Sequence, residues 1–238
     1  LANWLLDEVL SRSGDYEAAK VLRFYAVYRA MVRAKVAALR SAQGGASSSE
    51  VETYVALAER LLAPAALRLV ITHGLSGCGK TVASNALLQS DSRASSVRLR
   101  SDVERKGLAG LARHDASGSG AGTGLYGADA HQRIYGHLRE LTAMLLGAGW
   151  SVVVDATFLK RADRDDFCKL ARQMGAVFQI LAPQAPPELL RERILARSAT
   201  GQEASEATLA VLDQQMQTIE PLGPDEKCFE SVLSLRTE

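Results

Sequence analysis

The amino-acid sequence predicts an α/β protein, in which a parallel sheet flanked by helices follows an all-helical segment. From Leu67 onward, short apolar runs alternate with helical segments, which is the pattern of consecutive βαβ units. Residues 1–62 show only helical periodicity. The 238 residues are 47% hydrophobic, enough for the core of one α/β domain with an appendage or of two small domains. We therefore expect a helical segment over residues 1–63 and an α/β domain over residues 64–238.

The N-terminal segment is expected to contain three helices. A short helix over residues 3–11 ends before a turn at Gly14, and Asp15 can cap a long helix that runs to about Ser41. A third amphipathic helix follows over residues 49–62. The long helix carries an apolar stripe at three- and four-residue spacing, so this side should pack against another element. The stripe consists of Leu22, Tyr25, Tyr28, Val32, Val36 and Leu39.

The α/β part is expected to contain alternating strands and helices. Within it, the Gly/Ser-rich stretch Asp115 to Gly124 is too polar to pack, and is either a mobile loop over a site or a disordered insertion. Strands are expected over residues 67–72, 97–100, 151–155 and 177–181, with a last one near 229–235. Helices are expected over residues 82–89, 103–112, 128–146, 162–174, 187–198 and 205–218.

One stretch carries a complete sequence motif. After the first expected strand, the chain matches the phosphate-binding pattern G-x-x-x-x-G-K-[ST] at every fixed position. Its glycines let successive N–H groups turn toward one point, and the following helix start adds a positive dipole end. Lys80 would contact the outer phosphates of ATP, and the Thr81 hydroxyl would ligate the accompanying Mg²⁺. The alternative is a glycine-rich turn without a ligand. The expected nucleotide-binding residues are Gly74, Ser76, Gly77, Cys78, Gly79, Lys80 and Thr81.

Two further strands end in acids, at the edge of the sheet where parallel α/β proteins bind their ligands. After the second strand, Asp102 could accept a hydroxyl proton during phosphoryl transfer, and Arg105, one helical turn further, could hold the substrate. The alternative is a helix cap by Ser101 or Asp102 beside a surface arginine. After the third strand, Asp155 closes an apolar run as in a Walker B strand, and could orient Mg²⁺ or its waters.

Three further positions help to distinguish ATP hydrolysis from phosphoryl transfer: the residue that follows Asp155, and two arginines further along the chain. ATP-hydrolysing motors of the AAA and ABC type usually place a Glu there to activate water, whereas this chain has Ala156. Arg193 and Arg197 share a helix face one turn apart, where the cations of a closing lid could meet the transferred phosphate. Surface pairing with Glu188 or Glu192 is an equally open alternative.

Composition and charge argue against several other classes of protein, namely bulk nucleic-acid or membrane binders, disulfide-rich or zinc proteins, and membrane-spanning proteins. A net charge of +1 argues against bulk electrostatic binding to nucleic acid or to an anionic membrane. The three cysteines lack a C-x-x-C pair, so neither a disulfide framework nor a zinc site is indicated, and a reducing cytosol is expected. Among them, Cys78 should be the most reactive, because it lies beside a helix start. No apolar run approaches the length of a membrane span, and no signal-peptide pattern is found.

These residues resemble the small P-loop kinases of the AAA-like type, a group related to polynucleotide kinase and to chloramphenicol phosphotransferase. The resemblance implies a strand order of 2-3-1-4-5, an Asp102 that acts on the substrate hydroxyl, and basic lid residues that clamp the phosphates. It covers about residues 67–226. It rests on Gly74 to Thr81, on Ser101-Asp102-x-x-Arg105, on Tyr126 with Tyr135, and on Val152 to Phe158.

The helices of residues 1–62, especially from residues 22–25 through residues 33–35, carry a second resemblance. They look like the closing helices of an aminoglycoside-phosphotransferase-like domain that is often fused ahead of this kinase. The body of that domain is absent here, since the chain has no H-G-D-x-x-x-x-N catalytic loop. A second kinase activity is therefore not expected.

The leading hypothesis is an ATP- and Mg²⁺-dependent kinase that phosphorylates a hydroxyl on a small molecule or on a nucleic-acid end. The alternative is a nucleotide-binding regulatory module whose slow ATP hydrolysis serves a fused or partner domain. The candidate base Asp102 and the missing hydrolytic Glu favour the kinase. An aromatic content of 5% provides few base-stacking platforms, which favours a small-molecule acceptor.

Overall fold

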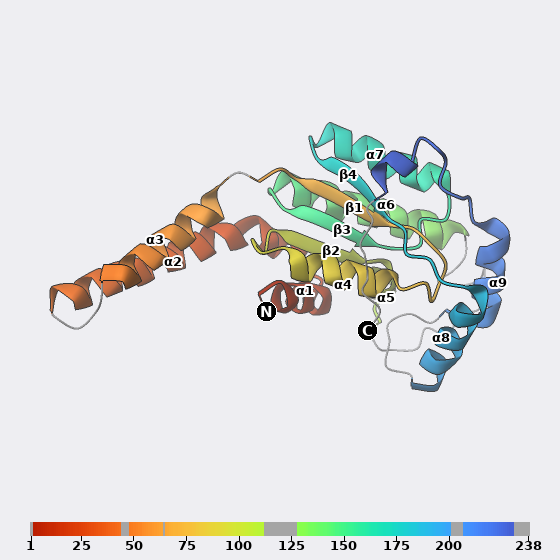
Figure 1. Cartoon of the computed structure of the whole chain (residues 1–238), viewed down its shortest axis with the longest axis horizontal. Coiled ribbons are helices and arrows are strands. Elements are labelled where there is room, and N and C mark those ends of the chain that lie inside the picture. The colour runs from red at the N-terminus through yellow and green to blue at the C-terminus, as the bar shows by residue number, and fades with distance from the viewer. Residues whose placement is uncertain (1, 44–47, 64, 112–127, 201–206, 231–238) are drawn as a thin grey trace. The chain divides into compact units, whose positions relative to one another are not determined.

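The structure, a computed structural model, describes residues 2–43, 48–63, 65–111, 128–200 and 207–230 (Figure 1). These residues form two compact units. The α/β unit comprises residues 1–14 and 67–238, and the helical unit comprises residues 15–66. The Gly/Ser-rich stretch over residues 115–124 lies outside the described residues.

The α/β unit is built on a parallel sheet in the order β2-β3-β1-β4 (Figure 1). The central strand β1 pairs with a neighbour on each side, so that Leu69 lies opposite Val152 of β3 and Phe178 of β4. All residues of β2 and β3 are buried, as expected of strands covered by helices on both faces. The four strands and their order agree with the sequence-based expectation. Their bounds are Arg68–Thr72 (β1), Ser96–Arg100 (β2), Ser151–Asp155 (β3) and Val177–Leu181 (β4).

The fifth strand that the sequence predicts is not present among the described residues. The short helix η3 (Lys227–Phe229) occupies the start of the expected range. Glu230 then makes a single parallel bridge to Ile180, on the β4 side of the sheet where a fifth strand was expected. The remainder of that range lies outside the described residues.

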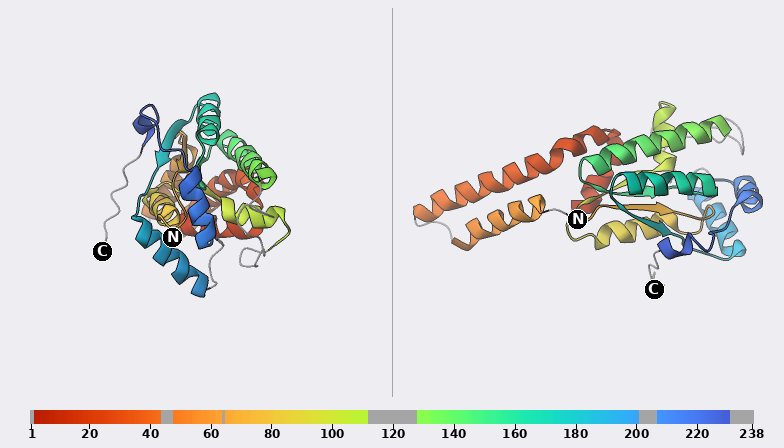
Figure 2. Two further views of the ribbon diagram at one scale, coloured as in Figure 1. Left: turned by 90° about the vertical axis from the view of Figure 1, so that its right-hand side faces the viewer. Right: turned by 90° about the horizontal axis from the view of Figure 1, so that it is seen from above.

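Helices cover both faces of this sheet and the ends of its strands. Helix α4 packs on one face, and α6 and α7 pack on the other (Figures 1 and 2). Helix α5 follows β2, while α8 and α9 lie beyond the carboxyl ends of the strands (Figure 1). The bounds are Lys80–Ser90 (α4), Ser101–Leu108 (α5), Ala128–Gly147 (α6), Arg161–Gln173 (α7), Pro187–Thr200 (α8) and Leu209–Thr218 (α9).

The first helix, α1 (Ala2–Ser13), belongs to the α/β unit and not to the helical unit. It packs against β2 and α4. The Asn3 side chain donates to the carbonyls of Leu88 and Asp91 at the end of α4. The division therefore differs from the one expected from sequence, which assigned residues 1–63 to one segment, because α1 finds its polar partners in the sheet unit.

The helical unit consists of the short helix η1 (Tyr16–Ala18), α2 (Ala19–Ala42) and α3 (Ser48–Leu62). The predicted cap at Asp15 is confirmed, since its carboxylate accepts from the Ala18 N–H at 3.2 Å. The prediction of the packed side of α2 is wrong. Its buried residues are alanines, and small side chains let helices approach closely. The predicted stripe lies outward instead: Leu22, Tyr25, Tyr28, Val36 and Leu39 are exposed.

Among the described residues, no helix combines the length and the apolar character needed to cross a bilayer.

Candidate functional site

The phosphate-binding motif forms a loop that leaves β1 and enters α4. Backbone hydrogen bonds tie its start to both neighbouring strand ends: the His73 N–H donates to the carbonyl of Leu181, the last residue of β4, and the Gly74 N–H donates to the carbonyl of Thr157, just after β3. Helix α4 begins at Lys80, two residues earlier than expected, and the Ala83 N–H bonds the Gly79 carbonyl. Hydrogen bonds within the protein therefore anchor the loop at both ends.

Glycine is required in this loop for two reasons. Gly74, Gly77 and Gly79 have φ values of +140°, +86° and +100°, a region that side chains with a Cβ rarely adopt. A Cβ on Gly74 would lie 2.8 Å from Cys78 Sγ, and one on Gly77 would lie 3.1 Å from the Leu190 carbonyl. The glycines of the loop thus follow from backbone angle and, at Gly74 and Gly77, from close packing.

The charged end of Lys80 lies beside the loop backbone. Its Nζ donates to the carbonyls of Gly74 at 3.0 Å and Leu75 at 2.7 Å. Arg193 reaches the same loop from α8, with Nη1 3.0 Å from the Gly77 carbonyl. Two cations from different helices therefore lie at the loop. Such an arrangement suits several negative phosphates.

Helices α8 and α9 pack directly on the loop. Leu190 of α8 and Leu212 of α9 form a buried apolar cluster with Cys78. Gln215 of α9 accepts a hydrogen bond from the Ser76 N–H at 2.8 Å. No sequence pattern indicated a role for Gln215, because its partner Ser76 lies 139 positions away.

The expectation that Cys78 is the most reactive cysteine is not supported by its surroundings. Its thiol is buried against α8 and α9, whereas Cys228 is exposed and Cys168 is buried. A thiol needs access as well as a favourable electrostatic setting to react. The sequence revealed the helix start but not the apolar cover.

Asp155 ends β3 and is buried, with 6% of its surface exposed. Its carboxylate accepts from the Ser84 hydroxyl at 3.2 Å. Ser84 lies one turn into α4, and its hydroxyl is also 3.1 Å from the Thr81 carbonyl. The acid expected to orient Mg²⁺ is therefore connected to the helix turn that carries Thr81.

The segment after β3 has an unusual backbone at Phe158, a non-glycine residue with φ +44°. Side chains from three elements hold it: His73 Nδ1 donates to the Phe158 carbonyl at 3.0 Å, and the Phe158 N–H donates to the Tyr135 hydroxyl at 3.0 Å. Arg164 also donates to the Phe158 carbonyl, at 3.0 Å. Backbone strain of this kind persists only where the surroundings fix it.

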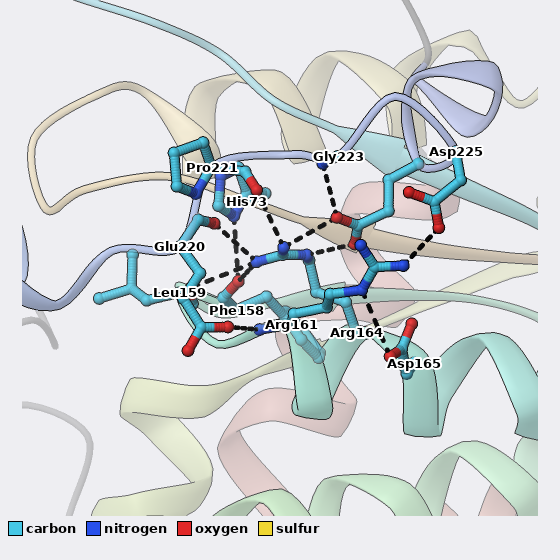
Figure 3. Close-up of polar contacts among 11 residues, drawn as sticks. His73, Phe158, Leu159, Arg161, Arg164, Asp165, Glu220, Pro221, Gly223 and Asp225 are labelled. Carbon is cyan, nitrogen blue, oxygen red and sulfur yellow. Dashed lines mark hydrogen bonds and ion pairs between the residues drawn. The ribbon is translucent and has the colours of Figure 1, made fainter.

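Arg164 is the centre of this arrangement (Figure 3). Its guanidinium, 1% exposed, makes a two-point ion pair with Glu226 at 2.6 and 2.9 Å. The remaining donors reach the carbonyls of Leu159, Glu220 and Pro221. Arg164 thus joins the segment after β3 to residues 220–226. No sequence pattern indicated its pairing with Glu226, because the two residues lie 62 positions apart.

Burial sets the protonation of this cluster. Burial, together with the positive charge of Arg164, holds the pKa of His73 below its usual value, so this ring is neutral at neutral pH. Burial also raises the pKa of Tyr135 to about 12. For Glu226, burial alone would raise the pKa, but hydrogen bonds from Arg164 and Gly223 outweigh it and lower the pKa.

Asp102 lies in the first turn of α5, at the carboxyl end of β2. Its carboxylate is 3.5 Å from Arg105 Nη1, and both side chains are partly buried. The N-cap of α5 is Arg100, and among the described residues no side-chain capping hydrogen bond is made there. The alternative in which Ser101 or Asp102 caps this helix is therefore wrong.

The two arginines expected to form a lid, Arg193 and Arg197, have different surroundings. Arg193 contacts the loop, as described above, and Arg191 pairs with Asp213 of α9 at 2.5 Å. Arg197 lies one turn beyond Arg193 and is partly buried. Two histidines pair with acids: His131 with Asp163 at 2.9 Å and His137 with Glu104 at 3.1 Å. Across the described part of the chain, no group of three or more His, Cys, Asp or Glu side chains could hold a metal ion.

Comparison with protein families decides where the chain belongs. A family model described as "AAA domain" matches residues 69–222. The chain belongs to this AAA domain family. The matched range runs from β1 to just beyond α9 and contains every candidate site residue. The AAA domain of this chain therefore includes the loop, both strand-end acids, Arg193 and Arg197, and its fold is that of a P-loop kinase.

Individual proteins similar to this AAA domain chain include one curated relative and two solved structures. The Mycobacterium tuberculosis protein Rv2004c is 27% identical over 213 residues, which are 89% of this chain and 42% of Rv2004c. The chain thus spans less than half the length of the curated relatives it matches. A sugar kinase from Janibacter sp. HTCC2649 has a TM-score of 0.50 at 23% identity, over 72% of this chain and 87% of that one. A chain of the Pnkp1/Rnl/Hen1 RNA repair complex has a TM-score of 0.50 at 17% identity, over 66% of this chain and 45% of that one. At these identities the likeness concerns the fold.

Proposed function

We propose that this AAA domain is a kinase that transfers the γ-phosphoryl group of ATP to a hydroxyl, on a small molecule or on a nucleic-acid end. The observation that carries the proposal is the combination of a phosphate-binding loop with Asp102 at the same edge of the sheet. Such a loop holds a nucleotide, and a carboxylate at a neighbouring strand end supplies a base. Since Asp102 has no capping role, its place in the fold favours this function.

The loop supplies the nucleotide site. Its positive-φ glycines and the start of α4 support contacts with phosphate oxygens through backbone N–H groups. Lys80 and Arg193, both already at the loop, would contact the transferred phosphate, with Arg197 one turn further along α8. These arginines form the proposed lid.

Thr81 and Asp155 are the residues that would hold Mg²⁺. Both offer oxygen atoms, the donors that this hard cation prefers. The buried carboxylate of Asp155 and the first turn of α4 share the Ser84 hydroxyl, so the donor set fits. Bound Mg²⁺ neutralises charge on the phosphoryl oxygens.

In the proposed transfer, the acceptor oxygen attacks the γ-phosphorus, and the bond to the β–γ bridging oxygen breaks as ADP leaves. The hydroxyl proton goes to the Asp102 carboxylate. Arg105, beside Asp102, would hold polar groups of the acceptor. An aromatic content of 5% favours a small-molecule acceptor. The fold neighbours include a sugar kinase and a chain of an RNA repair complex, so both acceptor classes enter the test.

The test is a transfer assay with purified protein, ATP and Mg²⁺ against pooled hydroxyl compounds and 5′-hydroxyl oligonucleotides. We expect one pool to be phosphorylated. Lys80→Ala should lose both transfer and the stabilisation that ATP and Mg²⁺ give in thermal unfolding, because a site cation is removed. The matched control is Lys169→Ala, which removes an exposed lysine of α7. It should behave as the unsubstituted protein does.

Two results would count against the kinase. If Lys80→Ala kept the full ATP-dependent shift in melting temperature, the loop would not be the nucleotide site. If ATP were hydrolysed slowly without transfer to any pool, and Asp102→Asn left that rate unchanged, the alternative of a nucleotide-binding regulatory module would replace the kinase.

We also propose that α2 and α3 are the end of an aminoglycoside-phosphotransferase-like domain. The exposed apolar side chains of α2 support this, because Phe24, Tyr25 and Tyr28 are each more than half exposed. In a full-length relative, hydrogen exchange along α2 should be slower than in this chain. Equal exchange in both would contradict the proposal.

We place the reaction in the cytosol. Supporting this, all three cysteines are free. Cell fractionation would test the location.

A further inference from the structure

Helix α1 lies outside the residues that match the AAA domain family, yet it buries a carboxylate against the sheet. Asp7 of α1 and Arg98 of β2 are 8% and 4% exposed. Their contact is bidentate: Arg98 Nε lies 3.1 Å from Oδ1, and Nη2 lies 2.6 Å from Oδ2. Figure 1 shows α1 beside α4, next to the sheet. A buried charge pair of this kind is costly to form, so it calls for a functional explanation.

The third nitrogen of Arg98 points to the candidate site. Nη1 donates to the Ser84 hydroxyl at 3.1 Å. Ser84 is fully buried and in turn contacts Asp155 at 3.2 Å and the Thr81 carbonyl at 3.1 Å. Four side chains from α1, β2, α4 and β3 therefore form one continuous hydrogen-bonded chain.

The donors in this chain have fixed directions. A guanidinium only donates, so the Ser84 oxygen must accept from Arg98, and the Ser84 proton is left for Asp155 or for the Thr81 carbonyl. Asp7 occupies the Nε/Nη2 edge of the guanidinium and so directs the remaining nitrogen, Nη1, at Ser84. Asp7 also neutralises Arg98, so this cation does not cancel the charge of Asp155.

We propose that Asp7 and Arg98 are positioning residues for the phosphate and metal site. By fixing Ser84, they hold Asp155 against the first turn of α4, which carries Lys80 and Thr81. Helix α1 then contributes to the geometry of the kinase site through Asp7. This inference rests on the proposed function, because it assigns Asp155 to the Mg²⁺ site.

The test uses a double variant, Asp7→Leu with Arg98→Met. Removing both charges avoids an unpaired buried ion, and such replacements are often tolerated. The measurement is the Mg²⁺ concentration that gives half of the ATP-dependent rise in melting temperature. Loss of groups that orient metal ligands typically weakens metal affinity about 10- to 100-fold. We expect the Mg²⁺ midpoint to rise at least about tenfold, with ATP binding in EDTA unchanged.

The matched control is Asn3→Ala, which removes the contact of α1 with the end of α4 and leaves Asp7 and Arg98 in place. It should keep the normal Mg²⁺ midpoint. If the double variant does not fold, Ser84→Ala decides the matter, since it breaks the same chain and should raise the midpoint similarly.

Two outcomes overturn the inference. A folded double variant, or Ser84→Ala, with an unchanged midpoint would show that the Asp7–Arg98 pair only anchors α1. An unsubstituted protein whose stabilisation by ATP did not depend on Mg²⁺ would overturn the proposed metal site as well. The two failures are therefore distinguishable.

Discussion

The variant Arg164→Met should unfold at a much lower urea concentration than the unsubstituted protein. The side chain is 1% exposed, makes both contacts to Glu226 and donates to four backbone carbonyls. Removing one partner of a buried pair typically costs about 3–5 kcal/mol, because the other charge is left buried and unpaired. This is a large part of the roughly 5–15 kcal/mol that stabilises a typical domain. Urea unfolding at neutral pH measures the loss.

Two further variants separate the contributions. Arg164→Met with Glu226→Leu removes both charges and should recover about 1–3 kcal/mol, the coupling expected for contacting residues. Recovery should be incomplete, because the carbonyls after β3 still lack their donor. Arg161→Met, in the same helical turn, breaks an exposed pair with Asp225 and should stay close to the unsubstituted protein. A loss for Arg164→Met no larger than for Arg161→Met would refute the reasoning.

Three other expectations follow from the site. Gly77→Ala should lower the free energy of unfolding by about 1–3 kcal/mol and weaken ATP-dependent stabilisation, because it adds a Cβ at φ +86° against the Leu190 carbonyl. A melting temperature equal to that of the unsubstituted protein, both with and without ATP, would contradict the close contact. Since the pKa of His73 is lowered from 6.5, its stabilising effect is present above that pH and lost below it. The melting temperature should therefore fall between pH 7 and 5, more steeply than in His73→Asn, and parallel curves would refute this assignment. A maleimide should label Cys228 well before Cys78, as read by mass spectrometry, and the reverse order would contradict the buried thiol.

The features that the sequence predicted depend on neighbouring residues. The loop from Gly74 to Thr81 is recognisable because its glycines, its lysine and the start of α4 are contiguous. The four described strands were found within one residue, since buried parallel strands are short apolar runs. Asp102 and Asp155 were chosen as candidates because parallel strands present their carboxyl ends at one edge of the sheet, and both lie at that edge.

Most features that the sequence did not predict depend on pairs of residues that lie far apart along the chain. Arg98 interrupts an apolar strand and looks like a polar surface position, until Asp7, 91 positions away, is seen to neutralise it. Arg164 has the same character, since its partner Glu226 is 62 positions along the chain. The alanine side of α2 was missed for another reason: a hydrophobic stripe indicates a helix but does not say which side its neighbour covers.

The central claim is that Asp102 is the base of a phosphoryl transfer. Asp102→Asn keeps the size of the side chain and removes the proton acceptor, and the structure excludes a capping role that could confuse the result. Positioned acid–base catalysis contributes about 10²–10⁴ in rate, or roughly 3–5 kcal/mol of barrier.

The decisive measurement compares transfer rate, ATP affinity and melting temperature of Asp102→Asn with those of the unsubstituted protein, using the acceptor found in the screen. We predict unchanged ATP binding and melting temperature, with phosphoryl transfer slower by at least about a hundredfold. Transfer at the unsubstituted rate, with Asp102 replaced, would contradict the account.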